Sequence, residues 1–194
     1  EKRPFFLEGS DLFRLPIGNS DGTVETAFYS RRIGAAPDTS NLDYAYLRAP
    51  PATTIYGAAK LTGKRDGWSV GLLDAVTSRE GASLIDDAGA RHDLDVAPLT
   101  NDAVARVKRD LNEGKTSIGV SATAVDRALG GTGLEDAMHD QAYTAGAQIL
   151  HRWDDNAWTL DFHAVGSLVH GTAAAIEQTQ EDTIHLYQRP DATN

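Results

Sequence analysis

Asp161, His163 and Ser167 are the residue types of a catalytic triad, in which a carboxylate orients a histidine that activates a serine hydroxyl. Apolar residues alternate with them, which predicts that all three lie on one face of a strand. At about 3.3 Å per residue, His163 and Ser167 would be about 13 Å apart. A serine nucleophile must lie within about 3 Å of its base. The spacing therefore excludes a triad within this strand and favours a row of polar side chains.

Other candidate motifs also point to turns rather than to chemistry. Gly114-Lys115-Thr116 resembles the end of a phosphate-binding loop, but that motif needs a glycine where Arg109 stands. Asp154-Asp155-Asn156 lacks the glycine and the distal glutamate of a calcium loop and is typical of a turn. The six histidines include no pair at metal-ligand spacing on one helix face. We therefore expect no catalytic residue, metal site or cofactor within this chain.

Composition narrows the class of protein. The 194 residues carry a net charge of −10, which disfavours a nucleic-acid partner because such partners need a basic face. The absence of cysteine excludes disulfides and thiolate metal sites. No apolar run approaches the roughly 18 residues of a membrane helix. A transmembrane β-barrel remains possible, because only alternate residues of its strands need be apolar.

From Thr53 onward, apolar and polar residues alternate, which indicates strands with two different faces. Short turns separate paired strands, whereas long polar stretches near residues 79–101 and 128–140, and a third after Gly171, separate the pairs. This asymmetry is typical of outer-membrane barrels, whose strands need about 9–11 residues. We predict six strands in a meander, at residues 53–62, 68–77, 102–111, 115–126, 142–152 and 157–169.

The two predicted faces differ in character. The apolar face is rich in alanine and glycine and should hold Ile55, Trp68, Val70, Val107, Ile118, Val120, Ile149, Leu160 and Phe162. The polar face should line a lumen with Lys60, Arg106, Lys108, Asp110, Gln148, Asp161 and His163. A soluble antiparallel sheet with one wet face would give the same alternation. The charges favour a wet lumen, in which they either pair across strands or tune which solutes pass.

Three tryptophans next to turns, Trp68, Trp153 and Trp158, are placed where an aromatic girdle would lie at the membrane surface. The first and last predicted strands should each keep one unpaired edge and should not pair with each other, because the smallest barrels have about eight strands.

Residues 1–52 read as an irregular segment that packs on or inside the barrel wall, because prolines interrupt any regular element. One short strand is expected around Thr26–Ser30. The charged residues of this segment either form ion pairs with the wall or are solvated at the surface. The ion-pair candidates are Lys2, Arg3, Glu8, Arg31 and Arg32.

Several segments resemble a family of bacterial outer-membrane β-barrel proteins of unknown function. They are Glu1–Gly9, Phe28–Gly34, Gly57–Gly63, Arg106–Asp110, Gly119–Thr123 and Tyr187–Asp191. In that family the barrel follows an N-terminal module similar to family-nine carbohydrate-binding domains. The resemblance implies that the chain is an internal stretch of a longer protein in the outer membrane of a Gram-negative bacterium. Gln148 departs from the family pattern, which has an acidic residue there.

The sequence therefore predicts an all-β fold: an antiparallel meander of about six strands at residues 53–194, forming an incomplete transmembrane β-barrel, preceded by the irregular segment 1–52. The expected partners are the lipid bilayer and the rest of the same barrel, with carbohydrate bound through the upstream module. The leading function is a transport or surface protein linked to carbohydrate recognition. A hydrolase with its active site in loops or in missing regions is one alternative, and a structural or adhesive surface barrel is another.

Overall fold

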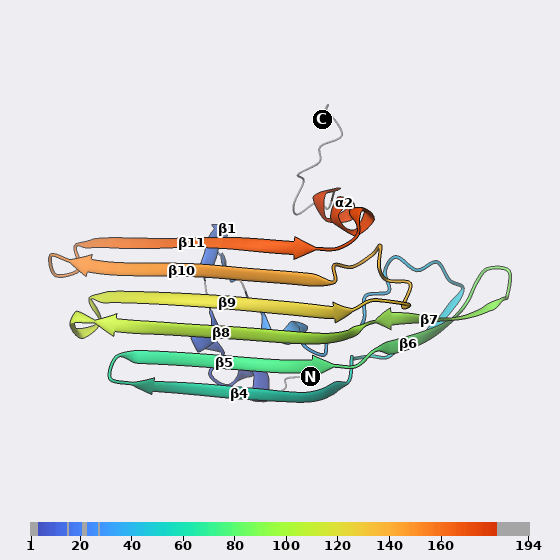
Figure 1. Ribbon diagram of the computed structural model, residues 1–194, viewed down its shortest axis with the longest axis horizontal. Helices are drawn as coiled ribbons and strands as arrows, with labels where there is room; N and C mark the ends of the chain where they lie inside the picture. The colour runs from blue at the N-terminus through green and yellow to red at the C-terminus, as the bar shows by residue number, and fades with distance from the viewer. Residues whose placement is uncertain (1–3, 15, 21–22, 27, 182–194) are drawn as a thin grey trace, which may run out of the picture.

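The computed structural model describes residues 4–14, 16–20, 23–26 and 28–181, which form a mostly antiparallel β structure (Figure 1). The largest sheet has six strands in the order β11-β10-β9-β8-β5-β4. They are β4 (Ile55–Arg65), β5 (Trp68–Thr77), β8 (Leu99–Leu111), β9 (Thr116–Ala128), β10 (Gln141–Trp153) and β11 (Trp158–His170). The six predicted strands are confirmed, with ends that differ by up to three residues. β4 and β11 are the two edges of the sheet, as expected, and do not pair with each other.

The three short turns lie at one end of this sheet and the long connections at the other (Figure 1). Between β4 and β5 the turn is only Asp66-Gly67, with φ of 50° and 81°. An Asp-Gly pair with two positive φ angles is the preferred two-residue hairpin loop, because it matches the twist of the strands. The five residues left between the predicted strands 53–62 and 68–77 were therefore too many, and β4 continues to Arg65.

A second sheet occupies part of the stretch predicted as a long loop. β6 (Glu80–Ile85) pairs with β7 (Arg91–Ala97), and β3 (Tyr46–Arg48) pairs with β6. The sheet projects beyond the long-connection end of the large sheet (Figure 1). Ala82, Leu84 and Val96 are buried there. The loop prediction was wrong because these few apolar residues alternate with many polar and charged ones, so the stretch has the composition of a loop.

The remaining elements are short. They are α1 (Pro4–Leu7), η1 (Ser10–Phe13), β1 (Pro16–Ser20), β2 (Thr23–Thr26), η2 (Ser30–Arg32), η3 (Asn112–Gly114) and α2 (Ala173–Glu181). The strand expected at Thr26–Ser30 is wrong: β2 ends at Thr26, whose hydroxyl donates to the Phe28 carbonyl at 3.0 Å and so competes with a strand ladder. A helix, α2, follows β11 where a loop was expected. Within the described ranges, no helix is long and apolar enough to cross a membrane.

The register of the six strands separates two faces. The apolar face comprises the alternate residues in register with Leu61, which include all the predicted apolar residues except Ile55. A register shift between Ile55 and Gly57 turns Ile55 to the opposite side. A bulge of this kind inserts one residue, so the side chains that precede it point to the opposite face of the sheet. The opposite side, in register with Lys60, is called the covered face below.

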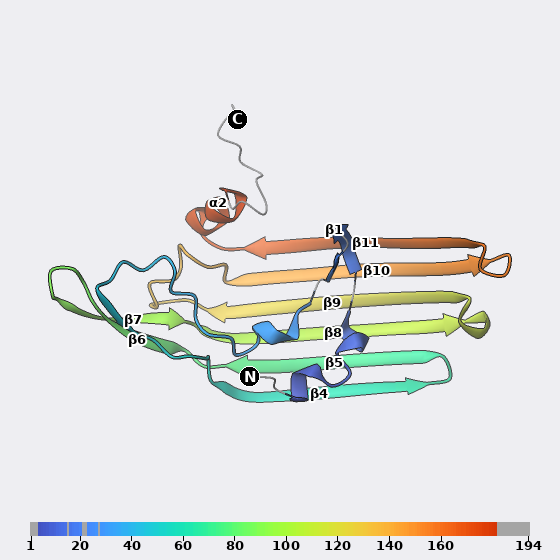
Figure 2. The same cartoon turned by 180° about the vertical axis from the view of Figure 1, so that it is seen from behind.

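The hydrophobic core lies on the covered face, under the N-terminal segment (residues 4–35), which crosses that side of the sheet (Figure 2). Its buried members are Phe6, Phe13, Ile33, Leu73, Ala75 and Val104, with Phe28 and Ile55 packed against them. Phe13 is 3% exposed and sits directly on Gly71, which has no side chain to displace it. β1 extends the cover as far as β11.

Substitution of Gly71 tests this packing. In Gly71→Ala, the new Cβ would lie 2.9 Å from Cε1 of Phe13, too close for either group to stay in place. Overpacking of this kind costs about 1–3 kcal/mol, and we expect that loss in the free energy of unfolding measured with urea. Gly63→Ala is the matched control, because its Cβ would meet nothing within 4 Å. Equal stability of the two variants would show that Phe13 does not pack on Gly71.

Candidate functional site on the covered face

The seven polar residues expected to share one face do so. The register places Lys60, Arg106, Lys108, Asp110, Gln148, Asp161 and His163 on the covered face. One row across the sheet joins Lys108 to Gly119, Gly119 to Gln148, and Gln148 to His163. Ser167 lies opposite Thr144, four positions along β11 from His163, in agreement with the exclusion of a triad.

Six of the seven residues form three pairs. Nη2 of Arg106 donates to Oε1 of Gln148 at 2.7 Å. Nζ of Lys108 lies 3.1 Å from Oδ1 of Asp110. Nδ1 of His163 lies 3.8 Å from Oδ1 of Asp161, which is an ion-pair distance but not a hydrogen bond. The polar residues of this face therefore form separate pairs and not one open cluster.

Arg106 reaches across a whole strand to its partner. It projects from β8, and Gln148 projects from β10, with β9 between them. The guanidinium passes over Gly119, where a Cβ would lie 3.7 Å from Nη2. Among the described side chains, the buried polar atoms without a hydrogen-bond partner are Oγ of Ser69, Nη1 of Arg106 and Nδ1 of His163.

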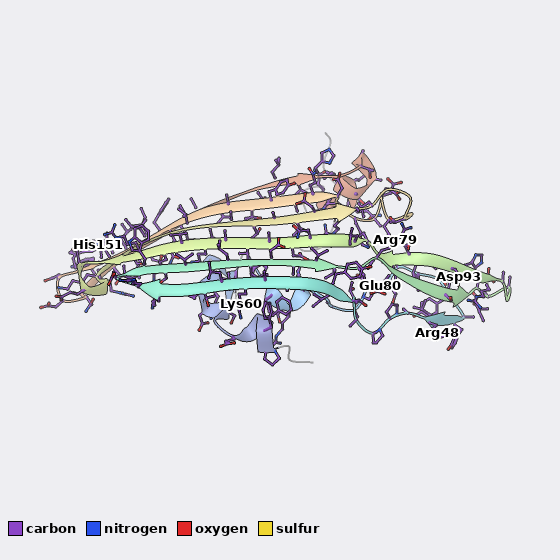
Figure 3. All side chains as sticks on the ribbon, turned by 60° about the horizontal axis from the view of Figure 1, so that its bottom comes forward. Arg48, Lys60, Arg79, Glu80, Asp93 and His151 are labelled. Atoms are coloured by element: carbon purple, nitrogen blue, oxygen red, sulfur yellow. The ribbon has the colours of Figure 1, made fainter. Side chains whose placement is uncertain are left out.

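Lys60 is on the predicted face but contacts the N-terminal segment instead of the other polar residues (Figure 3). Its ammonium donates to the carbonyl oxygens of Phe5 and, at 2.8 Å, of Glu8. It also lies 4.9 Å from the centre of the Phe5 ring, a favourable cation–π distance. Lys60 therefore fastens the start of the N-terminal segment to β4.

The ion pairs proposed for this segment take a different form. Lys2 and Arg3 lie outside the described residues. Glu8, Arg31 and Arg32 make no ion pair with any residue in the described ranges. The contacts of the segment use backbone carbonyls instead: besides Lys60, the Ser30 hydroxyl donates to the Phe6 carbonyl at 3.1 Å. A sequence does not show such acceptors, because every residue has a carbonyl.

All three tryptophans lie at the short-turn end of the apolar face, and each has an aromatic or cationic neighbour. Trp153 and Trp158 stack with ring centres 6.4 Å apart. His151, at the same end in Figure 3, stacks on Trp153 at 5.4 Å. Arg109 lies 4.8 Å over the Trp68 ring. The sequence indicated the tryptophans, but not the roles of His151 and Arg109.

The opposite end carries a network of ion pairs on the β6–β7 hairpin that the sequence did not reveal. Arg79 pairs with Asp95 through two nitrogens and donates to the Gly131 carbonyl at 2.9 Å, which ties the hairpin to the loop after β9. The hydrogen bond from Arg79 lowers the pKa of Asp95. The Ser83 hydroxyl and then Arg91 lower the pKa of Asp93. Figure 3 shows Arg79 at the base of this hairpin and Asp93 farther along it.

A family model matches residues 1–178, which include both the N-terminal segment and the six-stranded sheet. The chain belongs to this family, a domain of unknown function (DUF5916). Neither the curated proteins nor the solved structures gave a match. In the described part of this DUF5916 chain, no group of three or more His, Asp or Glu residues is arranged to hold a metal ion.

Replacing Lys60 should loosen the N-terminal segment of the DUF5916 chain. Lys60→Met removes two charged hydrogen bonds, each worth about 1.5–3 kcal/mol, and 1.4 kcal/mol corresponds to about a tenfold change in an equilibrium. We expect protease cleavage within residues 4–14 to become about tenfold faster or more. Lys64→Met, on the same face of the same strand, is the control and should leave the rate unchanged. The role assigned to Lys60 fails if the two variants are cleaved at the same rate.

The β6–β7 hairpin should lose stability in acid. The pKa values of Asp86, Asp93 and Asp95 lie below their ordinary value of 3.8. Stabilisation by such carboxylates is fully present above the unfolded pKa and is lost as the pH falls through the folded pKa. Amide-exchange protection of residues 80–97 should therefore fall as the pH drops below about 4. Arg79→Gln should weaken this pH dependence, and an unchanged profile would contradict the assignment of the Arg79–Asp95 pair.

Proposed function

We propose that this chain forms part of the wall of an outer-membrane β-barrel that transports solutes. In this proposal the apolar face contacts lipid, and the covered face lines the lumen with the N-terminal segment lying inside. The rest of the same barrel supplies the strands that β4 and β11 lack. The link to carbohydrate recognition by an upstream module rests on the sequence resemblance alone.

The observation that carries the proposal is the exposed apolar face. Val120 and Phe162 are both 54% exposed and Leu168 is 68% exposed, whereas the core is formed on the face that also carries the charges. A soluble monomer rarely exposes a continuous apolar patch larger than a few hundred Å². A sheet that packs its charged face and leaves its apolar face bare is suited to an apolar solvent outside and a wet interior.

The length of the apolar face along the strands matches the thickness of the apolar layer of a bilayer. The three tryptophans lie at one end of the apolar face. At the other end lies a row of polar residues: Asn101, Asp126, Gln141 and His170. From Gln141 to Trp153 along β10, 12 steps of about 3.3 Å give about 40 Å. At a strand tilt of about 45° this length spans about 28 Å, close to the roughly 25 Å apolar band of such barrels.

Successive strands are also offset from one another along the strand direction, as tilted strands in a barrel must be. In the row that starts at Trp68, the partners are Arg109, Ile118, Ile149 and Phe162. β8 continues past this row by two residues to Leu111, and β10 by four to Trp153. The stagger is therefore about one residue per strand. In a barrel of eight strands a shear of eight corresponds to a tilt of about 36°.

The bare edges support the need for further strands. β4 and β11 each have one neighbour in the six-stranded sheet. Unpaired backbone groups in lipid cost several kcal/mol each, so a membrane-spanning sheet must close. Closure within these six strands would give fewer than the roughly eight strands of the smallest barrels.

A charge on each face tests the membrane orientation. In the full-length protein, Val120→Arg places a cation in the centre of the apolar face and should cost about 2–4 kcal/mol if that face contacts lipid. We expect at least a tenfold loss of the folded, protease-resistant fraction in lipid vesicles. Ser167→Arg, at an exposed position on the covered face of β11, should insert normally. Normal insertion of Val120→Arg would rule out the proposed orientation.

A further inference from the structure

Arg106 is a buried cation whose hydrogen-bond partner is a neutral group. The residue is 7% exposed, and its Nη2 donates to the amide oxygen of Gln148 at 2.7 Å. Its Nη1 is also buried and has no hydrogen-bond partner. Burying a guanidinium is costly unless an anion compensates its charge. No carboxylate among the described residues lies within ion-pair distance of Arg106.

Two carboxylates of the covered face lie next to basic residues other than Arg106. Asp110 pairs with Lys108 at 3.1 Å, and Asp161 faces His163 at 3.8 Å. Arg106 is therefore a buried cation without a carboxylate partner among the described residues.

The surroundings of the guanidinium offer further hydrogen-bond donors. Ser121, which is buried, is the direct cross-strand neighbour of Arg106. Gln148 accepts through Oε1, which leaves its Nε2 group as a donor on the same side of the sheet. Gly119, the cross-strand neighbour of Gln148, has no side chain, and the guanidinium passes over it. Guanidinium, hydroxyl and amide groups at neighbouring positions of one face are donors of the kinds that bind an oxyanion.

We propose that Arg106, with Ser121 and Gln148, binds the carboxylate or phosphate group of a small anionic solute. The fork of the guanidinium matches the two oxygens of a carboxylate or two oxygens of a phosphate, and the bound anion supplies the missing negative charge. The site requires the folded sheet and not the bilayer, so it goes beyond the proposed membrane function. In a barrel, the same site would favour anions over cations in the lumen.

The test measures the stabilisation of the purified full-length protein in detergent by sodium formate and by sodium phosphate, with sodium chloride at equal ionic strength as the reference. Wild-type protein should show a saturable rise in unfolding midpoint with formate and phosphate. At a concentration ten times the dissociation constant, the unfolding equilibrium constant should fall about elevenfold relative to chloride. Equal effects of all three salts would overturn the oxyanion assignment.

Three variants assign the effect to the site. Arg106→Gln should abolish the response to formate. Gln148→Glu should also abolish it, because the new carboxylate pairs with Arg106 internally, and this variant should be more stable than wild type in chloride. Arg109→Gln is the matched control: Arg109 is on the same strand but on the apolar face, over Trp68, and its loss should leave the response intact.

If Arg106→Gln does not fold, Gln148→Glu still tests the site, because this variant retains the arginine. A formate response that persists in Gln148→Glu or in Arg106→Gln would show that the anion binds elsewhere. Because these measurements need no vesicles, a negative result here is distinguishable from failure of Val120→Arg to affect insertion.

Discussion

The packing of Phe13 on Gly71 decides which side of the sheet is the inside of this molecule. A six-stranded antiparallel sheet has two faces, and either can in principle bury a core. Here the N-terminal segment brings Phe6, Phe13 and Ile33 onto the face that carries Lys60 and Arg106, with Leu73, Ala75 and Val104 beneath them. The larger apolar surface, which includes Val120 and Phe162, is left without a cover in the described structure. The membrane proposal follows from this arrangement, in which the charged face is packed and the apolar face is bare, more than from the apolar content of the strands.

The same contact influences the polar residues. Gly71 is the cross-strand neighbour of Arg106, and the Phe13 ring occupies the space above it. The Arg106 side chain extends the other way, over Gly119 to Gln148. Two glycines on either side of one arginine thus admit an aromatic ring on one side and the guanidinium on the other. A side chain at either glycine would change where the charge lies.

The sequence predicted the elements whose signals are local. Alternation and turn residues such as Asp66-Gly67 located all six long strands, and parity alone assigned seven polar residues to one face. Ile55 was misplaced because a bulge changes parity without any characteristic residue at that position. The β6–β7 hairpin was missed because its buried apolar residues, Ala82, Leu84 and Val96, lie among charged residues that resemble those of a loop. Contacts of Lys60 with the carbonyls of Phe5 and Glu8 join residues more than fifty positions apart and have no counterpart in the pattern of side chains.

The two ends of the sheet have different tasks in the barrel proposed for this chain. At the short-turn end, Trp153 and Trp158 stack on each other and Arg109 covers Trp68. In the proposed barrel, these amphipathic rings and this cation would lie where lipid meets water. At the other end, Arg79 joins the β6–β7 hairpin to the loop after β9 through Asp95 and the Gly131 carbonyl. Such a fixed connection is of little use in lipid, but in water it reduces the conformational freedom of two long connections at once. The side chains of one end therefore suit the interface between lipid and water, and those of the other end suit water. The apolar strands between the two ends are long enough to span the lipid layer in the proposed barrel.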